Sequence, residues 1–346
     1  MLVASIWNID WELRIKREAV GATRPMPRPK IGRLTDWQTL ERRQRGNMQQ
    51  LSRELLVGAF DLHTHGYPEI HRGLGMALDD FEQAEYAKSR GMAGYVLKSH
   101  IWPTMDRVYH IRQRVGDIKI VSCIVLNSII GGIQPGVLEA AILQGAESVC
   151  FPTWSSVNDL SNSGFSRTIR KELPSLEPFL KEGLSVIDAF GELTQDARDV
   201  LRVANEAKIL VSTGHLSGRE SVLLAQEADR IGFRRLVVTH PDSNSVRASD
   251  EEILESAKCG AFIEWTLHGT MPKSQRTKPQ KIVEWIERLG AGSCVLTTDV
   301  FGRSSLPEPD ELQLYLGILL ELGVSVEDIK TMSQTNPLGL VARSGE

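Results

Sequence analysis

Asp61-Leu62-His63-Thr64-His65 closes an apolar run and places two histidines two residues apart. In a β-strand alternate side chains point to the same face, so a strand here would project both imidazoles to one side of a sheet. Two neutral imidazoles on one side are half of a metal site. An isolated histidine is more often a hydrogen-bonded structural or surface residue, so the pair becomes a site only if other parts of the chain bring ligands to it.

Short apolar runs alternate with stretches of helical period from Leu55 onward, which is the pattern of repeated strand-helix units with a parallel sheet. Eight runs predict strands, at residues 55–62, 94–99, 119–126, 148–151, 209–213, 236–239, 261–266 and 294–298. Helices are predicted between them, among others at residues 80–90, 135–144, 196–207, 218–231, 250–258 and 279–289. Eight repeats favour a closed (β/α)8 barrel of the TIM type.

Three further segments do not fit this simple repeat. An apolar run at residues 184–188 is a ninth candidate, interpreted as an excursion between the fourth and fifth strands. The Gly/Ser-rich residues 155–164 and residues 266–278 are predicted to be loops on the face where the strands end. Loops at that face commonly cover a site.

The basic N-terminal part of the chain looks different from the rest. Residues 11–50 are rich in Arg and Lys, contain Pro25, Pro27 and Pro29, and show no sustained apolar period. We therefore expect an extension over residues 1–50 and a barrel domain over residues 51–346. The charge of the extension fits a nucleic-acid arm less well than ordinary solvation or a contact between subunits, because aromatic residues are sparse there.

The composition of the chain argues against a nucleic-acid-binding, membrane or disulfide-rich protein. With 346 residues, a hydrophobic fraction of 41% and a formal net charge of -4, the chain has material for a large core and no broad basic field for nucleic acid or an anionic membrane. No apolar stretch reaches the roughly 18 residues of a membrane helix. The four cysteines lack Cys-x-x-Cys spacing, which indicates reduced, buried thiols. We expect a cytoplasmic homo-oligomer without a secretory leader that acts on a small molecule.

Polar side chains also follow other predicted strands. They are Lys98 and His100 after the second strand, His215 after the fifth, His240 after the sixth and Asp299 after the eighth. In a barrel these strand ends meet on one face. Imidazoles and a carboxylate are ligands that zinc and related divalent metals favour, with room left for water. The pattern therefore predicts a hydrolytic metal site.

In order and strand assignment, His63, His65, His215, His240 and Asp299 match the amidohydrolase superfamily. The resemblance runs from about Leu55 to the C-terminus and includes an Asn-Pro pair at residues 336–337 before the last turn. The segments at 96–100 and 131–133 resemble a little-characterised branch of that superfamily.

The resemblance implies a divalent metal, Zn²⁺ first, with Mn²⁺, Fe²⁺ or Ni²⁺ as alternatives. His63, His65 and Asp299 would bind one ion, while His215 and His240 would bind a second ion or complete a single-metal site.

One departure concerns the bridge between two metals. Many members carry a carboxylated lysine or a glutamate at the end of strand four, and residues 150–154, Cys-Phe-Pro-Thr-Trp, offer neither. Lys98 on the second strand is the alternative, because a carbamate on its side chain would supply the missing bridging oxygens.

The expected activity is hydrolysis of a small carbonyl compound, namely an amide, cyclic amide, lactone or ester. A metal-activated water would attack, Asp299 would act as general base and then general acid, and His240 or the metal would polarise the carbonyl. We expect Arg72, His100 and His268 to contact the substrate, with the Arg72 guanidinium suited to an anionic group. A metal-dependent lyase, such as a decarboxylase or hydratase, is the alternative. A non-catalytic binding protein is a third hypothesis, against which the intact ligand set argues.

Overall fold

The computed structural model describes residues 47–342 except 273, 275, 303 and 304. The chain divides into two units, Met1–Gly46 and Asn47–Glu346, and only the second contains described residues. The extension predicted over residues 1–50 thus lies outside the described residues apart from its last four. Those four begin a helix that spans residues 47–56.

Eight parallel strands form one sheet in the order β1-β2-β3-β4-β5-β6-β7-β8. Their bounds are β1 Phe60–His65, β2 Gly94–Lys98, β3 Lys119–Val125, β4 Ser148–Cys150, β5 Leu210–Ser212, β6 Leu236–Val238, β7 Phe262–Thr266 and β8 Cys294–Thr297. The chain just after β8 returns to β1, where the backbone N–H of Asp299 donates to the carbonyl of His63 at 3.1 Å. The predicted (β/α)8 TIM-type barrel is confirmed.

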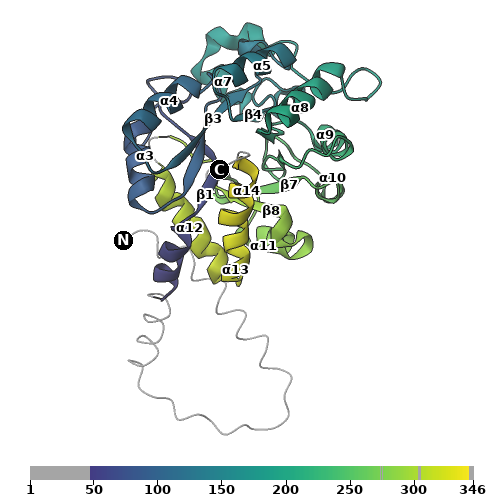
Figure 1. The fold of residues 1–346 in the computed structure, drawn as a ribbon. Helices are drawn as coiled ribbons and strands as arrows, with labels where there is room; N and C mark the ends of the chain where they lie inside the picture. Colours follow the sequence, from purple (N-terminus) through teal and green to yellow (C-terminus); the bar gives the residue numbers. More distant parts are fainter. Residues whose placement is uncertain (1–46, 273, 275, 303–304, 343–346) are drawn as a thin grey trace, which may run out of the picture. The chain divides into compact units, whose positions relative to one another are not determined.

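Helices surround the strands, as Figure 1 shows. Their bounds are α3 Asp80–Ser89, α4 Met105–Arg114, α5 Pro135–Leu143, α6 Val157–Asn162, α7 Ser166–Glu172, α8 Gln195–Ala207, α9 Gly218–Arg230, α10 Asp250–Lys258, α11 Pro279–Leu289, α12 Glu308–Glu321, α13 Val326–Lys330 and α14 Asn336–Val341. Several begin at a side-chain cap: Asp79, Ser217 and Ser249 each form a capping box with a glutamate three residues on. Such caps satisfy N–H groups that a helix start leaves without partners.

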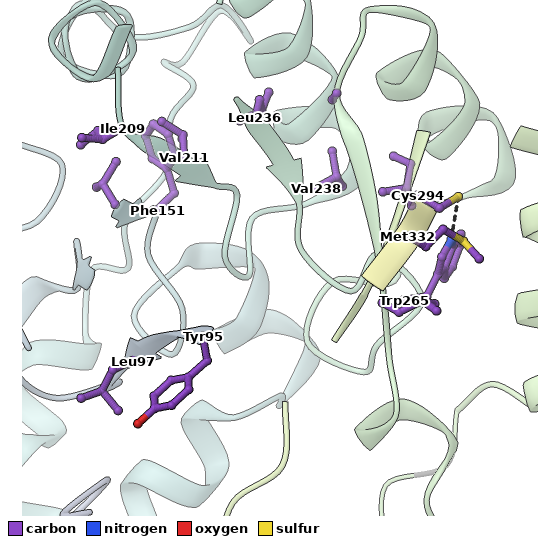
Figure 2. Close-up of a cluster of buried hydrophobic side chains, with 14 of the residues drawn as sticks. Tyr95, Leu97, Phe151, Ile209, Val211, Leu236, Val238, Trp265, Cys294 and Met332 are labelled. Carbon is purple, nitrogen blue, oxygen red and sulfur yellow. Dashed lines mark hydrogen bonds between the residues drawn. The ribbon is translucent and has the colours of Figure 1, made fainter. Parts of the chain in front are cut away.

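Alternate strand residues enter two different apolar layers. Tyr95 and Leu97 of β2 belong to a large cluster between the strands and the helices, part of which Figure 2 shows. Val96, between them, belongs to a second cluster inside the barrel, which Leu340 and Val341 of α14 complete. Both faces of the sheet are therefore buried, as expected for parallel strands that read as continuous apolar runs.

Two predictions about local structure were wrong. The first predicted strand, at residues 55–62, begins five residues too early, because Leu55 and Leu56 are buried on the helix over 47–56 and Gly58 turns the chain at a φ of 81°. Residues 155–164 are not one continuous loop. They contain α6, which starts where the Ser156 hydroxyl accepts a hydrogen bond from the N–H of Asp159.

Other predictions agree with the structure. Residues 184–188 form only isolated bridges, Ser156 with Leu184 and Ile187 with Leu193, and no barrel strand. All four cysteines are free, and Cys259 alone among them is more than slightly exposed. Within the described residues, no helix has the length and apolar character needed to cross a membrane.

Candidate metal centre

A β-bulge in β1 positions the first pair of histidines. Asp61 is paired with Tyr95 and Thr64 with Leu97. Between these two pairs β1 advances three residues while β2 advances two, so β1 contains one extra residue. The extra residue lets both Leu62, which joins the inner apolar cluster, and His63 face the inside of the barrel. His65 then follows on the same side as His63. Bulges of this kind commonly re-aim side chains beside active sites.

Asp299, just after β8, meets both histidines. Its Oδ1 lies 3.1 Å from Nε2 of His63 and 3.2 Å from Nε2 of His65. Its Oδ2 lies 3.8 Å from Nε2 of His240, which follows β6. One donor atom each from His63, His240 and Asp299 lies within 4.8 Å of the others, and all three side chains are buried. Three strand ends thus bring nitrogen and oxygen donors to one point.

His215, after β5, completes the predicted set of histidines. Its ring centroid lies 5.1 Å from that of His240, and its Nδ1 donates to Asp159 at 2.7 Å. With Nδ1 engaged by a carboxylate, Nε2 is the ring nitrogen left for a metal or substrate. His63 follows the same pattern, since its Nδ1 donates to Glu264 at 3.1 Å.

Glu69 joins two imidazoles at once. Its Oε1 accepts hydrogen bonds from Nδ1 and the backbone N–H of His100, the latter at 2.9 Å, and lies 3.3 Å from Nδ1 of His65. The two rings stack with centroids 4.6 Å apart and planes 6° from parallel. The charges of Glu69 and Asp299 raise the pKa of His65, although burial acts to lower it. A carboxylate on the far nitrogen of a metal-ligating histidine is the usual way to orient the ring.

His240 shows a buried atom without a partner. Its Nδ1 makes no hydrogen bond to the described residues, while its backbone N–H donates to Glu264 at 3.1 Å. The backbone of His240 has a φ of 23° and that of Asp299 a φ of 52°, both in the left-handed region that non-glycine residues seldom adopt. Strained backbone at two adjoining donors is common where a site must be held in one geometry.

The protonation states of His63, His240 and Asp299 suit a metal, whereas the raised pKa of His65 favours its charged form. Burial lowers the pKa of His63 well below its ordinary 6.5, although the charge of Asp299 acts against this. Burial also lowers the pKa of His100 and of His240 to about 3. Burial would raise the pKa of Asp299, but the neighbouring charge of His63 and a hydrogen bond from His65 hold it well below 3.8. Neutral imidazoles and an ionised carboxylate are the forms that bind divalent metals.

Lys98 lies inside the same cluster. Its Nζ donates to Nε2 of His63 at 2.8 Å, and the residue is 4% exposed. No carboxylate of the described residues lies within ion-pair distance of this ammonium. The positive charge therefore stands beside an imidazole lone pair and Asp299, at the place where a metal would be expected. The donor set fits a metal: nitrogen and oxygen donors converge, and the carboxylates behind them orient the rings.

A second carboxyl layer lies behind β1. Asp61 accepts hydrogen bonds from the backbone N–H of His63 at 2.8 Å and from the backbone N–H and hydroxyl of Thr298. Burial raises the pKa of Asp61 to about 7. Burial and the charge of Asp61 raise the pKa of Glu308, at the start of α12, well above its ordinary value. These contacts tie the bulged β1 to the end of β8.

A cavity of about 490 Å³ opens above these groups. His100, His215, His240, His268 and Asp299 are among the residues that line it, and His268 stacks on Phe301 with ring centroids 5.8 Å apart. Of the three residues predicted to contact substrate, His100 and His268 therefore face the cavity. The third, Arg72, is exposed, its carbonyl accepts from the Tyr67 hydroxyl, and it is not among the cavity residues.

Three carboxylates that orient the histidines were missed from the sequence. Glu264 carried a signal, since it is a charged residue within the apolar run Phe-Ile-Glu-Trp-Thr of β7. Glu69 and Asp159 carried none, because they lie in connecting segments and meet their histidines only through tertiary contacts.

Comparison with known proteins supports the fold. No curated protein matches the chain. Among solved structures, the probable dipeptidase PvdM from Pseudomonas aeruginosa is similar, with a TM-score of 0.55 and 12% identity over 86% of this chain and 98% of that one. A variant of the organophosphorus hydrolase from Deinococcus radiodurans reaches a TM-score of 0.50 and 17% identity over 83% and 93%. At such identities the likeness establishes the fold, and it is the barrel that the amidohydrolase resemblance implied.

At the level of sequence, a family model described as "Family of unknown function (DUF6282)" matches residues 58–264. The match covers more than half of the chain and runs from just before β1, with its two histidines, to Glu264 on β7. The chain therefore belongs to the DUF6282 family.

Proposed function

We propose that this protein is a metal-dependent hydrolase of a small molecule with an amide, cyclic amide, lactone or ester carbonyl. The observation that carries the proposal is the convergence of His63, His65, His240 and Asp299 at the strand ends, beneath a cavity. Barrel enzymes place their active sites at this face. The names of the fold neighbours, a probable dipeptidase and an organophosphorus hydrolase, support hydrolysis in particular.

His63, His65 and Asp299 would hold the first ion, and His240 with His215 would hold a second or complete the coordination of one. Nitrogen-rich ligands with a carboxylate favour Zn²⁺, with Mn²⁺, Fe²⁺ and Ni²⁺ as alternatives. A divalent metal bound here supplies Lewis-acid activation of water and of the scissile carbonyl.

Asp299 is the group we assign to proton transfer. Its low pKa keeps it ionised at neutral pH, the residue lines the cavity, and its Oδ2 lies 3.8 Å from Nε2 of His240. Asp299 would accept a proton from the attacking water and return it to the leaving group. His240, which lines the cavity, would donate to or orient the carbonyl oxygen.

Lys98 is proposed to supply the bridge that β4 lacks. Its amine would add to carbon dioxide and lose a proton, giving a carbamate whose two oxygens would be available as bridging donors. The Lys98 amine is buried and donates to Nε2 of His63, so a carbamate formed on it would lie among the candidate metal donors. Intact-protein mass spectrometry of metal-loaded protein prepared with bicarbonate should show an added CO₂ that Lys98→Arg lacks.

The deciding experiment combines metal analysis with a substrate screen. Purified protein should contain stoichiometric Zn²⁺ or a related ion, and lactones, cyclic amides and N-acyl compounds should be hydrolysed with oxygen from labelled water entering the product. Carbon dioxide release without label entry would identify a decarboxylase instead. Protein without metal and without turnover would contradict both enzyme functions and leave a binding role.

Zinc as the native metal, a cytoplasmic location and a homo-oligomeric state belong to the same proposal. The four free cysteines, three of them buried, support a reducing compartment.

A further inference from the structure

The rim of the cavity carries positive charge that the proposed chemistry does not use. Arg167 on α7 and Arg247 in the loop before α10 both line the cavity and are exposed. Among the described lining residues the single carboxylate is Asp299, which the proposed mechanism already uses. The mouth of the site is thus cationic above a floor of metal donors.

Neither rim arginine has an acidic partner in the described part of the chain. The contrast within α7 is direct: Arg170 pairs with Glu177 at 3.2 Å, whereas Arg167, one turn earlier, pairs with nothing described. Arginines on the outer helices also pair, for example Arg198 with Glu227 at 2.9 Å. An unpaired guanidinium at a cavity is available to a ligand.

Arg247 is held in place by backbone. Its Nε donates to the carbonyl of Asn244 at 3.2 Å and its Nη2 to the carbonyl of Asn162 at 3.4 Å. Its backbone has a φ of 56°, in the left-handed region. Because these bonds use two of five N–H donors, three remain free for an oxyanion.

The two segments that carry these arginines form one connected rim. The side chain of Asn158 donates to the carbonyl of Ser245 at 2.8 Å, and the backbone N–H of Phe165 donates to the Ser245 hydroxyl at 3.3 Å. A Cβ on Gly164 would lie 2.7 Å from that hydroxyl, so the segments are in close contact. Arg167 and Arg247 therefore lie on two segments that are packed against each other.

We propose that the substrate carries an oxyanion, a carboxylate or phosphate, remote from its scissile carbonyl, and that Arg167 and Arg247 bind it. This inference rests on the proposed function for the reacting end of the molecule. Guanidinium groups bind both anions through paired N–H donors, and the metal end and the arginine end would together fix the orientation of the substrate. In this proposal Arg167 and Arg247 make the anionic contact that was expected of Arg72, which is not among the cavity residues.

The test uses lactones and N-acyl amides made in sets of three that differ only in a remote group: carboxylate, phosphate monoester or uncharged carboxamide. Metal-loaded wild type should prefer an oxyanion over the carboxamide by about tenfold or more in kcat/KM, the worth of one charged hydrogen bond. Arg167→Gln should remove most of that preference by raising KM for the oxyanion substrates. Arg167→Lys should restore part of it, and Arg170→Gln, on the same helix, should behave as wild type. The better of the two oxyanions identifies the chemical class.

Equal rates for all three members in wild type would overturn the inference and leave the hydrolase intact. If no member is turned over, the proposed function fails and binding decides the inference separately. Calorimetry with glutarate and with inorganic phosphate on the metal-free protein should then show binding that Arg167→Gln weakens about tenfold. Absent binding, or equal binding by both proteins, would overturn it.

Discussion

Single carboxylates give the histidines of this site their direction. His63 and His215 each use Nδ1 to reach a buried acid, Glu264 and Asp159, and so present Nε2 to the common centre. Glu69 accepts a hydrogen bond from Nδ1 of His100 and lies 3.3 Å from Nδ1 of His65, and its second oxygen makes no described hydrogen bond. A ligand histidine held this way loses little rotational freedom when it binds a metal, which is the physical basis for strong metal affinity at small entropic cost.

Glu69→Gln should weaken metal binding by about 10- to 100-fold, because His65 would lose the charge that orients its ring. Competition with a chromophoric chelator measures this affinity directly. Glu172→Gln is the matched control, since Glu172 is a partly exposed acid that faces His71 on the surface. Equal affinity in wild type and Glu69→Gln would show that Glu69 has no part in the metal site.

Asp299→Asn should lower kcat by about 10²- to 10⁴-fold, the usual contribution of general acid-base catalysis. Asparagine tolerates the left-handed φ of 52° and keeps one oxygen donor, so the fold and most of the bound metal should remain. Turnover measured alongside metal content by mass spectrometry separates the two effects. Unchanged turnover with metal retained would remove proton transfer from the role of Asp299.

The candidate metal ligands could be predicted from single residues in the sequence, but the carboxylates that orient them could not. His63 lies near the end of β1, and His215 and Asp299 come three and two residues after β5 and β8, so strand-end position alone predicts that they meet. His63 and its support Glu264 are 201 residues apart, and Glu69 depends on how the loop after β1 folds over His100. No local sequence pattern predicts such contacts, because the residues meet only when the barrel closes.

Among the elements, α6 and α7 show how one side chain can join secondary structure to the site. Asp159, the third residue of α6, accepts hydrogen bonds from the N–H groups of Phe165 at 2.9 Å and Ser166 at 2.7 Å, where α7 begins. The same carboxylate receives Nδ1 of His215. The wall of the cavity and a candidate ligand therefore share one buried acid, which explains why a Gly/Ser-rich segment is structured here.

Asp159→Asn should destabilise the protein by about 2 kcal/mol at neutral pH. Burial would raise the pKa of Asp159, but its hydrogen bond from His215 and those from the Ser166 backbone lower it from 3.8 to about 2. A depressed pKa stabilises the fold above the unfolded value near 3.8, and this stabilisation is lost as the pH falls toward about 2. Urea unfolding of both proteins between pH 6 and pH 3 should therefore show a difference that shrinks below pH 4. If the difference in the free energy of unfolding does not depend on pH, the destabilisation comes from altered hydrogen-bond geometry and not from the lost charge.

Apolar periodicity in the sequence predicted most helices and strands, and the predictions that failed did so for a physical reason. The helices α10 and α11 match their predicted bounds, since a serine cap begins one and a proline at the first turn begins the other. The predicted strand at 55–62 failed because a buried helix and a buried strand both read as apolar runs of this length. The bulge in β1 was also invisible, since it depends on pairing with β2.

Across the whole molecule, the candidate metal donors come from strands at both ends of the sequence. His63 and His65 end β1, His215 and His240 follow β5 and β6, and Asp299 follows β8. The first and last strands meet at a seam where the Asp299 N–H donates to His63. A bound ion would therefore link parts of the barrel that are more than 200 residues apart in the chain, and would do so only in the folded state.

Metal loading should consequently stabilise the folded protein. At a free metal concentration of 1,000 times the dissociation constant, the gain is about 4 kcal/mol, provided the unfolded chain binds weakly. Thermal unfolding should show a higher Tm with Zn²⁺ than after chelation, with the difference growing as zinc is raised. His63→Ala should abolish that difference, and Glu172→Gln should keep it. The control matters because zinc also binds scattered surface groups, which would shift wild type and His63→Ala alike. An equal shift in those two proteins would mean that the stabilising ion is bound elsewhere than at the end of β1.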